Sequence, residues 1–134
     1  QLLDGTDYKD ISELSTGQRC TVVLPLILSH MNRMLIVDQP EDHIDNAFIA
    51  ETLIKVILSR GEQGQTIFST HNPNIPVLGD ADLVLHLGSD GRRGFRLSSG
   101  PLDEVSIVNA ISTVMEGGAK AFSQRARFYG EHIK

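Results

Sequence analysis

The chain has little cysteine and no long apolar run, and each shortage excludes a class of protein. Cys20 is the only cysteine in 134 residues, so neither an internal disulfide nor a cysteine-ligated zinc site can form. This fits a reducing compartment, and we expect a cytoplasmic protein. The longest apolar stretch, residues 22–28, is interrupted by Pro25 and is far shorter than the roughly 20 residues of a membrane-spanning helix. We therefore expect no membrane partner.

Excess positive charge is also missing. The formal net charge of -5 argues against a protein that coats nucleic acid with its whole surface. Acidic side chains gather between Asp38 and Glu51, in a stretch without lysine or arginine. Such a cluster can be a solvated surface, or it can bind a metal at the end of an apolar strand. Five arginines could contact nucleic acid, or could be scattered solubilising charge: Arg92, Arg93, Arg96, Arg125 and Arg127.

Short apolar runs alternate with helical periods along the chain. This pattern predicts an α/β fold with a mainly parallel sheet flanked by helices. Residues 1–13 are polar without a clear period, so we expect a lead-in loop. The expected strands are three buried ones at 34–37, 65–69 and 83–87 and an edge strand at 94–97, with a turn at 88–91.

Helix signals separate these strands. Ser15 is expected to begin a helix that runs toward Asn32 and is kinked at Pro25. A second helix is expected from Asp45 to Gly61. A turn at 72–74 is expected to lead to a short helix or loop, and two helical segments are expected in the tail, separated by Gly117-Gly118. We expect a single domain over 1–134, with a lead-in at 1–13, a core at 14–100 and C-terminal helices at 101–134.

The first motif is the run 13–19, Glu-Leu-Ser-Thr-Gly-Gln-Arg. Ser15 and Gln18 have capping-box spacing, and the amides of a helix N-terminus favour an anion. Taken alone, the run is an ordinary capping box. It closely resembles the signature motif of ABC ATPases, Leu-Ser-Gly-Gly-Gln, with Thr16 in place of the first glycine. The resemblance implies that Ser15, Thr16, Gly17 and Gln18 contact an ATP held by the partner in a dimer.

The second motif, residues 35–45, resembles a Walker B strand followed by the D-loop. That resemblance implies that Asp38 holds Mg²⁺ through water and that Asp45 lies at the dimer interface. Gln39 stands where the family has the glutamate that serves as base, and an amide can orient a water but cannot accept its proton. Either the nearby Glu41 takes over this role, or hydrolysis is slow and the site works as an ATP-gated clamp.

The third motif, residues 66–72, resembles the H-loop of the same family. The resemblance makes His71 a contact of the γ-phosphate, although a lone histidine after a strand is often an ordinary surface residue. The motifs follow one another in the family's order, and the match covers roughly residues 12–87. The candidate catalytic residues are therefore Gln39, Glu41 and His71, and the implied cofactors are ATP and Mg²⁺.

The phosphate-binding sequence Gly-x-x-x-x-Gly-Lys-Ser/Thr is absent from the 134 residues. Since the chain also opens on Gln1, we expect the C-terminal half of an ABC-type head, inactive without its upstream Walker A lobe. The runs 12–19 and 38–42 look like the SMC, RecF and SbcC type of DNA repair and defence, and the run 69–73 points the same way. The expected partners are the Walker A lobe, a second head in a homodimer, and DNA. The alternatives are an ATP-gated scaffold with little turnover and the nucleotide-binding subunit of a transporter.

Overall fold

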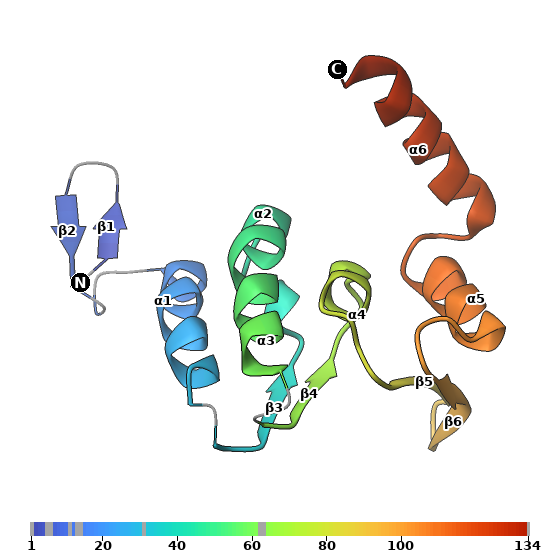
Figure 1. Cartoon of the computed structure of the whole chain (residues 1–134), viewed down its shortest axis with the longest axis horizontal. Helices are drawn as coiled ribbons and strands as arrows, with labels where there is room; N and C mark the ends of the chain where they lie inside the picture. The colour runs from blue at the N-terminus through green and yellow to red at the C-terminus, as the bar shows by residue number, and fades with distance from the viewer. Residues whose placement is uncertain are drawn as a thin grey trace. The chain divides into compact units, whose positions relative to one another are not determined.

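The computed structural model describes residues 2–4, 7–10, 12, 15–30, 32–61 and 64–133 (Figure 1). The chain forms two compact units, 1–70 and 71–134. The single domain expected from the sequence stays a prediction. None of the described helices combines the length and the apolar character needed to cross a membrane.

The first unit begins with a hairpin where the sequence predicted a loop. β1 (Leu2–Asp4) pairs antiparallel with β2 (Asp7–Lys9), and Leu3 lies opposite Tyr8. The prediction of a lead-in loop is wrong for these residues. Strands of three residues are too short to display the alternation by which strands are recognised in a sequence.

Helix α1 (Thr16–Leu28) begins where the sequence predicted. Ser15 is its N-cap and Gln18 completes a capping box, so both side chains satisfy amides that have no partner inside the helix. Pro25 lies within α1, and the helix nevertheless continues for three more residues. Leu28, at its last position, is fully buried.

A pair of parallel strands follows α1. β3 (Leu35–Asp38) pairs with β4 (Thr66–Ser69) in a register that places Leu35 beside Thr66 and Asp38 beside Ser69. This confirms two of the predicted parallel strands. Their full burial is not confirmed, because side chains alternate between half-buried and exposed and Ile36 is 75% exposed.

Most of the described part of the connection between β3 and β4 is helical. It comprises the 3-10 turn η2 (Pro40–Asp42), α2 (Asn46–Phe48), the π-helical segment η3 (Ile49–Leu53) and α3 (Ile54–Arg60). Asp45 caps the start of α2, as predicted. Both η3 and α3 contact α1. The core of the unit lies at this contact, where the buried apolar side chains are Leu28, Ile49, Leu53 and Ile54.

Arg60 is buried at the end of α3, with 1% of its surface exposed. Its Nη1 donates to the carbonyls of Leu28 (2.6 Å) and His30 (2.9 Å), and its Nη2 donates to the carbonyl of Arg33 (2.7 Å). Its Nε donates to Thr66 Oγ1 at 2.9 Å. One guanidinium therefore joins the end of α1, the loop before β3 and the start of β4.

The second unit carries the other hairpin and the C-terminal helices. α4 (Asn74–Leu78) is followed by β5 (Val84–Ser89) and β6 (Gly94–Gly100), and then by α5 (Val105–Val114) and α6 (Ala119–His132). The two tail helices are separated at Gly117 and Gly118, both with positive φ, as predicted.

The predicted third parallel strand pairs differently. β5 forms an antiparallel hairpin with β6, so the described strands make three two-stranded sheets, of which only β3–β4 is parallel. The turn explains the difference. Asp90 Oδ1 accepts hydrogen bonds of 2.8 Å from the amides of Arg92 and Arg93, which closes the hairpin locally. Local pairing requires far less loop closure than pairing with a distant strand. The expected mainly parallel sheet is thus reduced to one pair of strands.

Candidate functional site

The start of α1 presents residues 15–19 of the signature-like run, whereas residues 13 and 14 of that run lie outside the described residues. Ser15 Oγ accepts from the amide of Gln18 at 3.2 Å, and Gln18 Oε1 accepts from the amide of Ser15 at 3.1 Å. Ser15 and Thr16 are exposed. A hydroxyl that accepts one hydrogen bond can still donate its own hydrogen, and the first amides of a helix point outward. This end of α1 is therefore equipped to donate to an anion.

Gly17 brings this helix start against the segment that follows β3. A Cβ atom at Gly17 would lie 2.7 Å from the carbonyl oxygen of His43, closer than real Cβ contacts allow. The glycine is thus required by close packing. It joins the signature-like run to the stretch between Glu41 and Asp45, so two of the predicted motifs meet within one unit.

The carboxyl end of β3 carries the Walker B-like residues. Asp38 is exposed and lies opposite Ser69. Gln39 follows in a left-handed conformation, with φ 41° and ψ 60°. Its backbone N–H donates to the backbone carbonyl of Ser69 at 2.8 Å. Its side chain is exposed. Non-glycine residues adopt this conformation rarely, and such residues cluster at functional sites.

Glu41 lies in η2 and faces the end of β4. Thr70 Oγ1 donates to Glu41 Oε1 at 2.6 Å, and the second carboxylate oxygen, Oε2, is shielded from solvent. The sequence motifs did not single out Thr70. Thr70 lies within the H-loop-like run 66–72, but nothing in that run indicated that its hydroxyl would bind Glu41.

The two remaining candidates are placed by different elements. Asp45 is exposed, and its Oδ1 accepts from the amide of Phe48 at 2.7 Å. This cap orients the carboxylate at the start of α2. His71 is exposed and begins the second unit. The structure thus gathers the candidates from Ser15 to Asp45 within the first unit, whereas His71 belongs to the second.

The residues fit Mg²⁺ only as part of a shared site. Within the described ranges, no group of three or more histidine, cysteine, aspartate or glutamate side chains could hold a metal ion. Mg²⁺ is commonly bound by one or two carboxylates together with phosphate oxygens and water. The exposed Asp38 supplies one such carboxylate at the end of β3. A nucleotide would have to supply the phosphate ligands.

Two of the five arginines proposed as nucleic-acid contacts form ion pairs with glutamates of the same unit. Arg125 pairs with Glu116, and Arg127 Nε lies 2.8 Å from Glu131 Oε1. The backbone amides of Arg92 and Arg93 bind Asp90, and these two hydrogen bonds lower the pKa of the Asp90 carboxyl below its ordinary value.

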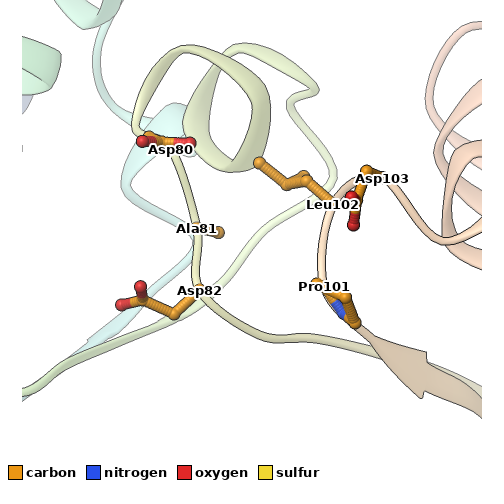
Figure 2. A pocket seen from close by; sticks show the side chains of 6 residues that line it. All are labelled: Asp80, Ala81, Asp82, Pro101, Leu102 and Asp103. Atoms are coloured by element: carbon orange, nitrogen blue, oxygen red, sulfur yellow. The ribbon is translucent and has the colours of Figure 1, made fainter.

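A shallow hollow of about 430 Å³ lies within the second unit (Figure 2). Its lining residues are Asp80, Ala81, Asp82, Pro101, Leu102 and Asp103. Figure 2 shows that the three carboxylates point in different directions. Their negative charge disfavours a phosphate ligand, and the hollow contains none of the residues predicted from the sequence.

Comparisons with known proteins give a distant relationship. No family model matches the chain, and no solved structure matches it. The chain is similar to the cytochrome c biogenesis ATP-binding export protein CcmA of Tatumella citrea, with 29% identity over 92 residues. The matched segment is 67% of this chain and 44% of that protein, so the chain spans less than half of its relative's length. At this level of identity, the similarity indicates a distant relationship to ATP-binding proteins of the ABC type.

Proposed function

We propose that the chain is the signature-to-H-loop portion of an ABC-type ATPase that dimerises around ATP. Its own ATP would be held by a Walker A lobe outside these 134 residues, and the start of α1 would act on the ATP of a second head. One observation carries the proposal. Gly17 packs against the carbonyl of His43, which joins the signature-like helix start to the segment that follows Asp38 and Gln39.

Each exposed candidate then has a chemical task. Ser15 and the first amides of α1 donate hydrogen bonds to the γ-phosphate of the partner's nucleotide. Asp38 holds Mg²⁺ through water, and the ion supplies neutralisation of phosphate charge when bound. Gln39 orients the attacking water without accepting its proton, so turnover is slow. Asp45 lies near the partner's nucleotide, and His71 contacts the γ-phosphate from its own side.

The proposal also includes the class of ATPase to which the chain belongs. The runs 38–42 and 69–73 favour an SMC- or RecF-like ATPase of DNA repair or defence. The second candidate is the nucleotide-binding subunit of a transporter, because the similar protein is named as an export protein. Turnover that rises with duplex DNA supports the first. Turnover that ignores DNA, in a protein that co-purifies with a membrane fraction, supports the second.

Two substitutions at Ser15 separate capping from phosphate contact. Asparagine and aspartate both cap helices as well as serine does, so each variant should leave the stability of α1 unchanged. Only Ser15→Asp places a negative charge against the partner's phosphate. In the protein joined to its Walker A lobe, we expect Ser15→Asp to abolish ATP-dependent dimerisation and turnover, and Ser15→Asn to retain both. If the two variants showed the same ATP-dependent dimerisation and turnover, Ser15 would be only a helix N-cap and not a phosphate contact.

The protein joined to its Walker A lobe also tests the alternative of an ATP-gated scaffold. ATP-dependent dimerisation without measurable phosphate release would support a scaffold that is gated by ATP. The comparison is a P-loop-deficient variant, in which the phosphate-binding sequence of the Walker A lobe is disrupted. Phosphate release faster than that of this variant would support an ATPase. The P-loop-deficient protein is the control because it should neither dimerise nor hydrolyse ATP.

A further inference from the structure

Glu41 and Thr70 connect two segments that the proposed site needs in one place. Glu41 lies just after β3, and Thr70 directly follows β4. Their hydrogen bond of 2.6 Å spans 29 residues of sequence. Where β3 and β4 end, the backbone N–H of Gln39 donates to the backbone carbonyl of Ser69. The Glu41–Thr70 hydrogen bond lies beyond this backbone hydrogen bond. The side chains thus extend the β3–β4 pairing past the end of the strands.

The carboxylate of Glu41 faces the protein interior. Oε1 accepts from Thr70, and Oε2 is shielded from solvent. A general base must come within about 2.6–3.2 Å of the water it activates. Asp38 and Gln39 are exposed, whereas Glu41 is half-buried and its Oε2 is shielded from solvent. The geometry therefore disfavours Glu41 as the group that meets the attacking water.

We propose that Glu41 and Thr70 form a latch, and that Glu41 is a positioning residue instead of the general base. The inference rests on the proposed function, in which this edge is an ATPase site. A hydroxyl-to-carboxylate bond of this length belongs to the strong, charge-assisted class. It fixes the place where the chain leaves β4, immediately before His71, relative to the Walker B-like end of β3. Gln39 is then the residue that orients the water.

Turnover of three variants distinguishes a latch from a base. Thr70→Val removes the hydroxyl and should lower kcat about tenfold, the effect of losing roughly 1.4 kcal/mol, with the KM for ATP little changed. Thr70→Ser keeps the hydroxyl and should restore turnover to within about twofold of the wild type. Glu41→Gln keeps an oxygen acceptor, so it should stay within about tenfold.

The base hypothesis gives the opposite order. General-base catalysis contributes about 10²–10⁴-fold, so Glu41→Gln would then lose at least about 100-fold while Thr70→Val stayed near the wild type. That result would overturn the latch. The matched controls are Asp42→Asn, at the exposed neighbour of Glu41, and Thr113→Val, at an exposed position of α5. Both should keep the wild-type turnover.

Urea unfolding of the 134-residue chain provides a measurement that needs no nucleotide. Glu41→Ala, Thr70→Val and the double variant form a double-mutant cycle in the free energy of unfolding. If the two side chains act only through their mutual hydrogen bond, the double variant should be no less stable than the less stable of the two single variants. Additive losses would overturn the latch whatever the turnover. Non-additive losses in a protein that never hydrolyses ATP would keep the bond as part of the fold, while its positioning role would fall with the proposed function.

Discussion

Replacing Arg60 by methionine tests whether one buried cation organises the first unit. The guanidinium makes four hydrogen bonds, three of them to the backbone carbonyls of Leu28, His30 and Arg33. Hydrogen bonds to a charged group contribute about 1.5–3 kcal/mol each, and desolvation of the buried charge offsets part of their sum. The carbonyls left without a donor at the end of α1 add to the loss. We expect a decrease of about 3–5 kcal/mol in the free energy of unfolding.

Urea denaturation followed by circular dichroism measures this loss. With an m value of about 2 kcal/mol per molar urea, the midpoint should fall by roughly 1.5–2.5 M. Arg60→Lys keeps the charge but not the planar fork, so it should lie between methionine and the wild type. Lys55→Met removes a cation from an exposed position of the same helix and should change the stability by less than about 0.5 kcal/mol. A shift below about 0.5 M for Arg60→Met would refute the reasoning.

Three further outcomes follow from single contacts. Gly17→Ala should destabilise the chain by about 1–3 kcal/mol in urea, because the new methyl group meets the His43 carbonyl. Gly130→Ala, with open space around it, should instead stabilise the chain by up to about 1 kcal/mol. A change in the free energy of unfolding of the same sign for Gly17→Ala and Gly130→Ala would contradict the packing argument. Asp45→Ala should cost about 1 kcal/mol in the same assay and Asp45→Asn much less, whereas equal losses would exclude a capping role. The lowered pKa of Asp90 means that its support for the β5–β6 hairpin is present above the unfolded pKa and is lost as the pH falls through the folded pKa. An NMR titration of the Asp90 carboxyl should show this, with Asp90→Asn abolishing the acid-dependent change in the turn, and an ordinary titration midpoint would contradict it.

Local signals in the sequence were sufficient for most element boundaries. Ser15 and Gln18 act on amides within one turn of helix, and Asp45 caps an amide three residues away. Gly117 and Gly118 have the positive φ that ends one helix and starts the next. Each of these effects depends on a few neighbouring residues, so it can be recognised without knowledge of the fold.

Pairing between distant segments could not be predicted in the same way. The run 83–87 is as apolar as a central parallel strand, yet the Asp90 turn directs it into a hairpin. Of the site, the sequence indicated which residues stand at strand ends, but not that Glu41 would bind Thr70 or that Gly17 would meet His43. These contacts join residues 26–29 positions apart, and no local pattern encodes such a distance.

The left-handed backbone of Gln39 sets stability against chemistry at one position. A side chain in this conformation costs the fold about 1–2 kcal/mol, a cost that glycine largely avoids. Gln39→Gly should therefore give a more stable protein that has lost the group proposed to orient water. Selecting variants of this chain for heat resistance alone would favour that exchange, so a search for thermostability would erode the proposed activity at this residue first.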